Sequence, residues 1–141
     1  MAMWLLKTEP DCYSWQRLVE EGKAVWDGVT NAQALIHLRA MQRGDEAFIY
    51  HTGGERAIVG LARIVSGPYE DPRQPGLNAR GEPKFAVVDV KATRPAKRPV
   101  MLAEIRGDDR FASFALVKQP RLSVMPVPRP LERLLREMSG L

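Results

Sequence analysis

The chain has 141 residues, of which 45% are hydrophobic, enough to bury the core of one domain but hardly of two. It has no apolar run of about 18 residues, and its start is too short and too weakly charged for a signal peptide, so we expect a single cytoplasmic domain over residues 1–141 with no membrane partner. With one cysteine and two histidines, neither an internal disulfide nor a zinc-binding pattern is expected, and we predict no metal and no cofactor.

The net charge of +4 is unevenly distributed along the chain. Residues 1–93 hold 11 Lys and Arg against 12 Asp and Glu, whereas residues 94–141 hold 10 against 5. An anionic partner would therefore meet the C-terminal third, where Arg98, Arg121 and Arg129 are candidate phosphate contacts. The same arginines could equally form a solvated surface, so charge alone suggests a nucleic acid without establishing one.

The first half of the chain predicts two capped helices among three strands. In chain order, the patterns predict a strand over 3–7, helices over 15–21 and 32–41, and strands over 47–51 and 57–65 that form a hairpin. Ser14 and Asn31 are suitable N-caps for the two helices. On the first helix, Leu18 and Val19 are expected to face inward.

The second half has fewer periodic segments. The patterns predict an exposed loop over 66–83, a strand over 85–93, an extended connector over 94–99, a short helix over 102–106, a strand over 121–127 and a helix over 130–138. Five or so strands, interrupted by helices that do not alternate regularly with them, favour an antiparallel or mixed curved sheet flanked by helices. The expected fold class is α+β and barrel-like.

Trp26 stands out because it lies at a predicted bend. It follows the short run 22–25 and precedes an Asp27–Gly28 turn signal. A tryptophan at such a position can line a cleft, where its flat ring would stack on a planar ligand. It can also be a half-buried core residue, as most tryptophans are.

Motifs for common enzyme chemistries are absent from the sequence. There is no nucleophile elbow, phosphate-binding loop, dinucleotide fingerprint or metalloprotease motif. Ser123, His51 and Asp27 could be imagined as a triad, but nothing in the sequence orders them. Glu9 and Asp27 could act as an acid/base pair on a glycosidic bond, so an enzyme acting on a base stays as an alternative.

Several motifs carry a resemblance to a known family. They are Trp4–Pro10 (WLLKTEP), Trp26–Asn31 (WDGVTN), Gly44–Asp45, Phe48–Thr52 (FIYHT), Val59–Ala62 (VGLA) and Arg121–Val127 (RLSVMPV). Together, and in this order, they resemble the EVE domain from Met3 to about Leu134. The resemblance implies a PUA-like curved β-barrel of about five or six strands flanked by helices, related to the YTH domains that hold a modified base in an aromatic pocket.

The resemblance implies a non-catalytic reader of a modified nucleobase in DNA or RNA. The alternatives are a glycosylase-like enzyme acting on such a base and a binder of a free small molecule. By motif position, the implied ligand-binding residues are Lys7, Thr8, Glu9, Trp26, Asp27, Asn31, Tyr50, His51, Thr52, Arg121, Leu122 and Ser123. The chain departs from the usual family pattern at Thr30, Ala32 and Phe85, which removes an expected phosphate-binding arginine and an aromatic contact.

Overall fold

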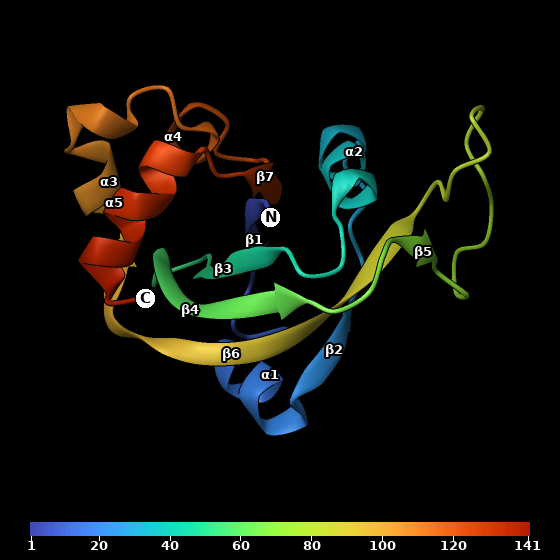
Figure 1. The fold of residues 1–141 in the computed structure, drawn as a ribbon, viewed down its shortest axis with the longest axis horizontal. Helices are drawn as coiled ribbons and strands as arrows, with labels where there is room; N and C mark the ends of the chain where they lie inside the picture. The colour runs from blue at the N-terminus through green and yellow to red at the C-terminus, as the bar shows by residue number, and fades with distance from the viewer.

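A strongly curved mixed sheet forms the centre of the computed structural model, which describes residues 1–141 (Figure 1). Its strands are β1 (Met3–Thr8), β2 (Lys23–Trp26), β3 (Glu46–His51), β4 (Ala57–Ile64), β5 (Tyr69–Glu70), β6 (Ala86–Met101) and β7 (Val124–Pro126). Their order is β2-β6-β4-β3-β1-β7, and β5 pairs with β6 off this path. The β1–β3 pair is parallel and the other pairs are antiparallel.

Helices surround this sheet at its ends. They are α1 (Trp15–Glu21), α2 (Ala32–Ala40), α3 (Leu102–Arg106), the 3-10 helix η1 (Asp109–Phe111), α4 (Ala115–Lys118) and α5 (Arg129–Ser139). In Figure 1, α3, α4 and α5 gather at one end, α2 stands above the sheet between β7 and β5, and α1 lies below the long curved β6. This arrangement is the α+β, barrel-like architecture that the sequence predicts.

The two predicted N-caps are present and start α1 and α2 where expected. Ser14 Oγ accepts the backbone N–H of Arg17, and Asn31 Oδ1 accepts that of Ala34. The inward face of α1 is narrower than predicted. Leu18 is buried, but Val19 is 45% exposed, because Trp15 and Leu18 on neighbouring turns already fill the contact between this short helix and the sheet.

Gly60 on β4 allows α1 to approach the sheet closely. A Cβ atom built at Gly60 would lie 2.7 Å from the Trp15 ring, so the flat indole can rest on this strand only where no side chain is present. The contact fixes α1, and with it the loop that leads from β1 into the helix.

β6 is longer than the sequence predicts, and it absorbs the segment expected to be a connector. The predicted strand over 85–93 and connector over 94–99 form one strand, Ala86–Met101. Prolines are compatible with this strand because its pairing slips there. Pro95 pairs with Gly60, and Val100 pairs with Ile58. Between these two pairs β6 contains more residues than β4, so several of them have no partner on β4.

The other side of β6 holds elements that the sequence analysis missed. The run before Trp26 is the strand β2, which pairs with β6. The predicted loop over 66–83 contains β5 and an isolated bridge between Leu77 and Pro83. Arg39 on α2 donates to the carbonyl oxygens of Pro83 and Lys84, which ties the base of this loop to the helix.

The C-terminal part also differs from prediction before its last helix. The strand expected over 121–127 forms only at Val124–Pro126, and residues 120–123 are a turn and bend that follow α4. The helix predicted over 130–138 is α5, Arg129–Ser139. The hydrogen bond from Leu122 N–H to the Gln119 carbonyl closes the turn, which explains why the first residues of the run do not continue the sheet.

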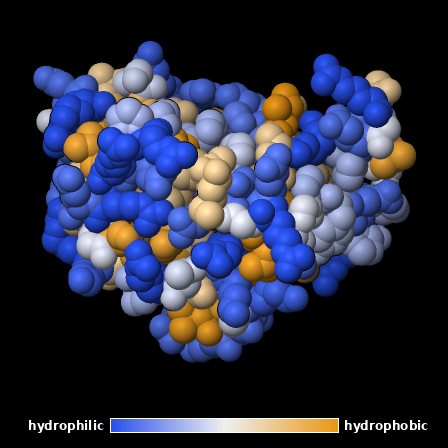
Figure 2. Space-filling view, viewed as in Figure 1, coloured by the Kyte–Doolittle hydropathy of each residue, from blue (hydrophilic) through white to orange (hydrophobic).

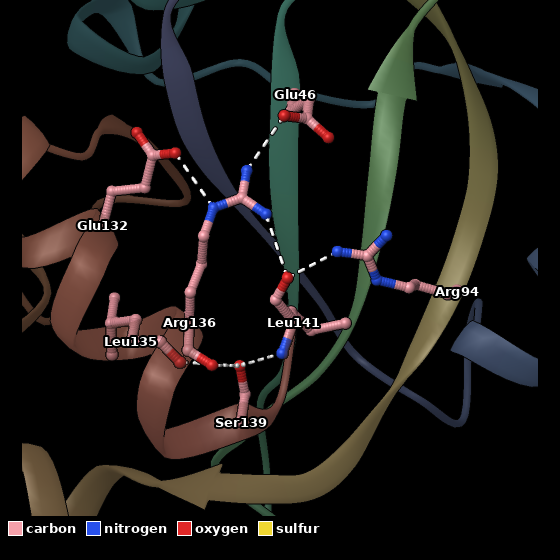
Figure 3. A network of polar contacts seen from close by, with 7 residues as sticks. All are labelled: Glu46, Arg94, Glu132, Leu135, Arg136, Ser139 and Leu141. Carbon is pink, nitrogen blue, oxygen red and sulfur yellow. Dashed lines mark hydrogen bonds and ion pairs between the residues drawn. The ribbon is translucent and has the colours of Figure 1, made fainter.

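A polar network attaches α5 to the sheet (Figure 3). The Arg136 guanidinium donates to Glu132 on the same helix at 3.0 Å, to Glu46 on β3 at 2.9 Å and to the Leu141 carbonyl at 3.2 Å. Arg94 on β6 donates to the same carbonyl. The network therefore joins α5, β3 and β6 at the end of the sheet away from β2.

The outer surface is mainly hydrophilic on the face shown in Figure 2, with hydrophobic residues in small separated areas. The exposed large hydrophobic residues come from different elements and include Val19, Ile36 and Leu77. None of the helices combines the length and the apolar character needed to cross a lipid bilayer.

Candidate functional site

A cavity of about 820 Å³ opens where β1 ends, between α1, β2 and the segment that leads to α2. This volume falls in the range typical of small-molecule sites. The residues that line it are Lys7, Thr8, Glu9, Cys12, Tyr13, Arg17, Glu21, Lys23, Ala24, Val25, Trp26, Asp27, Gly28, Val29, Thr30, Asn31, Arg73 and Ser123. Four of them are basic and three acidic, so the lining carries both signs of charge in nearly equal number.

Lys7 closes the cavity on the β7 side. Its backbone N–H donates to the Ser123 carbonyl and its Nζ to the Pro120 carbonyl, each at 2.9 Å, so the turn before β7 is held against the end of β1. Partial burial, together with the nearby Arg106 cation, lowers the pKa of Lys7. The Nζ also lies 5.7 Å from the centre of the Tyr50 ring, which forms the surface beneath it.

Glu9 lies over the turn between β3 and β4. Thr52 Oγ1 donates to Glu9 Oε2 at 3.3 Å, and a Cβ atom built at Gly53 would lie 2.9 Å from the same oxygen. Gly53 has a φ of +75°, a conformation that other residues rarely adopt. The turn therefore needs glycine for its backbone, and a side chain at this position would displace the Glu9 carboxylate.

Trp26 and Tyr13 form an aromatic corner of the cavity. Their ring centres are 6.2 Å apart and the planes meet at 86°, an edge-to-face contact. The Tyr13 hydroxyl donates to Glu21, and burial together with this hydrogen bond raises the pKa of Tyr13 well above its usual range. The phenol is therefore neutral at physiological pH.

Trp26 combines the two roles that the sequence left as alternatives. Its side chain is only 7% exposed and belongs to the hydrophobic core, yet it also forms part of the cavity wall. The pairing of β2 with β6 explains this position, because Trp26 is paired with the buried Val88 at the end of the strand. A substitution here will therefore affect both stability and the cavity.

Asn31 has one half of its amide already engaged. Its Oδ1 caps α2 by accepting the Ala34 N–H at 3.0 Å. The amide NH₂ makes no hydrogen bond within the chain, so Asn31 offers the cavity a donor rather than an acceptor. Asp27, which is exposed at the same rim, offers an acceptor.

The structure brings part of the predicted site together. Seven of the twelve predicted ligand-binding residues line the cavity, namely Lys7, Thr8, Glu9, Trp26, Asp27, Asn31 and Ser123. The other five, Tyr50, His51, Thr52, Arg121 and Leu122, do not line it. Their positions follow from the packing of β3 and of the turn before β7.

Tyr50 and His51 point into structural contacts instead of the cavity. Tyr50 is 3% exposed and lies beneath Lys7. His51 is buried, with Nε2 accepting the backbone N–H of Trp15 at 2.9 Å and Nδ1 facing Glu55 Oε1 at 2.9 Å. Both ring nitrogens therefore have partners, and this histidine fixes the start of α1.

Thr52, Arg121 and Leu122 lie next to the cavity. Thr52 reaches it indirectly through its hydrogen bond to Glu9. Leu122 is buried beneath the turn before β7, while Arg121 is exposed on that turn. Arg121 and Leu122 line a separate groove of about 360 Å³ that shares Asn31 with the cavity.

Five charged or aromatic lining residues were missed by the sequence analysis: Tyr13, Arg17, Glu21, Lys23 and Arg73. Tyr13 had a usable signal, because it is an aromatic residue in a polar turn directly before the Ser14 cap. Arg17 and Glu21 are spaced one helical turn apart, and Arg17 lies 5.5 Å from the Tyr13 ring centre. Arg73 comes from the loop after β5, and no local pattern connects it to the cavity.

The departures from the family pattern occupy three different environments. Thr30 is exposed and lines the cavity, so a longer side chain there would project from its rim. Ala32 is the first residue of α2 and is exposed. Phe85 packs against the core and does not line the cavity.

The structure does not assemble the candidate catalytic triad, but it brings the candidate acid/base pair to the cavity. Ser123 lines the cavity, but His51 is bound to Trp15 and Glu55, so the imagined triad is not assembled. Glu9 and Asp27 both line the cavity. The structure contains no cluster of three or more His, Cys, Asp or Glu side chains that could hold a metal ion.

The fold is a PUA-like barrel, and residues 2–138 match the EVE domain. The chain therefore belongs to the EVE domain family, as the motif resemblance indicates. It is 33% identical over 152 residues to thymocyte nuclear protein 1 of Homo sapiens, an alignment that covers 88% of this chain and 68% of that protein. The mouse protein of the same name is 34% identical, with 88% and 67% covered.

Solved structures share the whole architecture, and those of Rpa0253 and human THYN1 protein are two of them. The NMR structure of Rpa0253 from Rhodopseudomonas palustris has a TM-score of 0.88 at 43% identity and covers 99% of this chain and 94% of its own. Human THYN1 protein, solved in complex with DNA containing 5-methylcytosine, has a TM-score of 0.90 at 29% identity and covers 100% and 99%.

Proposed function

We propose that this protein is a non-catalytic reader that binds a modified nucleobase of DNA in the cavity beside Trp26. The observation that carries the proposal is the cavity wall, where the aromatic corner of Tyr13 and Trp26 stands beside hydrogen-bonding groups of both kinds. A base stacked on an aromatic ring gains roughly 1–3 kcal/mol. The human relative solved with DNA that contains 5-methylcytosine supports the proposal.

The base reaches the cavity by leaving the duplex. A base inside a double helix is stacked on both faces, so a protein that surrounds it must turn it out of the stack. A cavity of about 820 Å³ accommodates one base with its sugar. The near balance of acidic and basic lining residues favours a neutral heterocycle here over a phosphate group.

Selectivity comes from the edge of the base, because stacking tolerates any base. The carboxylates of Glu9 and Asp27 can accept hydrogen bonds from the exocyclic amine of a cytosine-type base. The NH₂ of the Asn31 amide can donate a hydrogen bond to an acceptor atom of the base ring. Val25 and Val29 supply apolar surface in the same cavity, against which a methyl group would pack. These features favour a methylated cytosine-type base.

The test compares matched oligonucleotides by titration. A labelled duplex with one 5-methylcytosine is measured beside the same duplex with cytosine, and beside an RNA of the same sequence carrying 5-methylcytosine. The modified DNA is expected to bind several-fold more tightly than the unmodified DNA, since one buried methyl group is worth about 0.8 kcal/mol. Equal affinity for the modified and unmodified duplexes would overturn the proposal.

The same samples separate a reader from an enzyme. After prolonged incubation, the modified oligonucleotide should be recovered intact. Release of free base would instead indicate glycosidic-bond cleavage, for which Glu9 and Asp27 are the available carboxylates. The variants Glu9→Gln and Asp27→Asn would then abolish the release, whereas in a reader they change affinity alone.

A further inference from the structure

A second, smaller groove continues from the cavity past Asn31. It has a volume of about 360 Å³ and is lined by Asn31, Gln33, Gln119, Pro120, Arg121 and Leu122. Asn31 lines both the cavity and the groove, so the two open onto the same stretch of surface. One wall comes from the start of α2 and the other from the turn before β7.

The groove is preformed by the contacts of that turn. Leu122 is 4% exposed and anchors the turn in the core, and its N–H donates to the Gln119 carbonyl at 3.0 Å. Lys7 Nζ donates to the Pro120 carbonyl at 2.9 Å. The backbone that carries Arg121 is thus fixed by the same lysine that lines the cavity.

The polar side chains of the groove are free to bind. Gln33, Gln119 and Arg121 are exposed, and their side chains make no hydrogen bond, ion pair or cation–ring contact within the chain. Two other arginines of the C-terminal third are ion-paired, Arg98 with Glu104 and Arg110 with Asp108. The groove itself contains no acidic residue, in contrast to the cavity.

We propose that this groove binds the backbone of the nucleotide next to the recognised base, with Arg121 on its phosphate and the two glutamine amides on its sugar and phosphate oxygens. The inference rests on the proposed function. A base turned into the cavity stays covalently attached to its neighbours, so the strand must leave the cavity along an adjoining surface. The groove offers a cation without a competing carboxylate, as a phosphate requires.

The test uses Arg121→Ala with Arg133→Ala as its matched control. Arg133 is exposed on α5, lines neither the cavity nor the groove and makes no ion pair. Its replacement by alanine lowers the net charge by one, as Arg121→Ala does, without removing a group from either site. A combined Gln33→Ala and Gln119→Ala variant tests the neutral donors. Thermal melts of all variants should match the parent protein, because none of these side chains is buried.

For a duplex with one 5-methylcytosine, Arg121→Ala should weaken binding about threefold to tenfold and reduce the slope of log K against log salt by about 0.9. The ratio of modified to unmodified affinity should stay unchanged, and so should binding of free 5-methyl-2′-deoxycytidine. The double glutamine variant should weaken duplex binding without changing the salt slope. Arg133→Ala should leave duplex affinity within twofold of the parent.

The inference fails if Arg121→Ala and Arg133→Ala have equal effects, or if Arg121→Ala weakens binding of the free nucleoside as strongly as that of the duplex. Its failure is distinguishable from failure of the proposed function. The proposed function fails in the parent protein, through loss of preference for the modified duplex, whereas the groove assignment fails only in the comparison of variants. A parent protein without that preference overturns both.

Discussion

Trp26 belongs both to the core and to the cavity wall, so its truncation should reduce stability and binding together. The side chain is 7% exposed, and a buried tryptophan removes about 200 Å² from water. At about 25 cal/mol per Å² this corresponds to about 5 kcal/mol, close to the roughly 3–5 kcal/mol typical of Trp→Ala in cores. For a chain of this length, Trp26→Ala should lower the melting temperature by about 10–15 °C.

Trp26→Phe separates the effect of losing an aromatic ring from the effect of reducing the size of the side chain. It keeps an aromatic face toward the cavity, so it should cost about 1–2 kcal/mol of stability and retain part of the affinity. In the folded fraction, Trp26→Ala should lose a further roughly 1–3 kcal/mol of binding to the modified nucleoside. Differential scanning fluorimetry and a nucleoside titration at a temperature below both melts measure the two effects separately.

Two outcomes would refute this reasoning about Trp26. A variant Trp26→Ala with an unchanged melting temperature would show that the ring is not part of the core. A large stability loss with unchanged affinity in the folded fraction would show that the ring does not contact the ligand. Val88→Ala, on the neighbouring strand and outside the cavity, is the control for a core truncation without a binding effect.

Three further predictions concern residues around the cavity and beyond it. His51→Ala leaves the buried Trp15 N–H unpaired, so it should lower the free energy of unfolding in denaturant by about 1–3 kcal/mol. Binding by the folded protein should not weaken, and a selective loss of binding would contradict the structural role of His51. Burial opposes ionisation of Asp45, but hydrogen bonds from Trp4 Nε1 and two backbone N–H groups lower the pKa of its carboxyl group. The ionised Asp45 therefore stabilises the folded protein above about pH 4, and this stabilisation is lost as the pH falls through the lowered pKa. Unfolding curves of Asp45→Asn should therefore differ most from the parent at neutral pH and converge at lower pH; a constant difference would rule this out. Thr30→Arg adds a cation at the cavity rim and should tighten duplex binding while leaving free-nucleoside binding nearly unchanged, an expectation that equal gains for both ligands would disprove.

Local signals were sufficient to predict the elements that end in a cap or a turn. Ser14 and Asn31 each accept a backbone N–H at the start of a helix, and this preference depends only on neighbouring residues. The hairpin of β3 and β4 follows equally from a glycine turn between two apolar runs. These elements were placed to within one or two residues.

Elements that depend on distant pairing were not predictable in the same way. Residues 94–99 contain two prolines and resemble a connector, but the slip in pairing with β4 lets β6 continue through them. The run 121–123 alternates like a strand, but the turn closed by Leu122 and Gln119 ends the sheet earlier. The conformation of 94–99 is therefore decided by the partner strand, and that of 121–123 by a turn that the alternating pattern does not reveal.

The site residues that local signals place were also predicted, whereas those that depend on packing between distant elements were not. Lys7, Glu9 and Asn31 reach the cavity from segments whose ends were correctly located, whereas Trp26 comes from β2, a strand that was not predicted. The family motif implied that His51 is a site residue, but its Nε2 accepts the backbone N–H of Trp15 at the start of α1. Tyr13 was missed because its approach to Trp26 depends on how α1 docks on the sheet.

The most direct test of the central claim measures whether a modified base occupies this cavity. Cys12 is the single cysteine of the chain, it is exposed, and it lines the cavity, so its alkylation rate reports on occupancy. At fixed pH, saturation with 5-methyl-2′-deoxycytidine should slow alkylation of Cys12 markedly, and the 5-methylcytosine duplex should do so at a lower concentration than its unmodified counterpart. An unchanged alkylation rate at concentrations where the titration shows bound duplex would contradict the assignment of the cavity as the base-binding site.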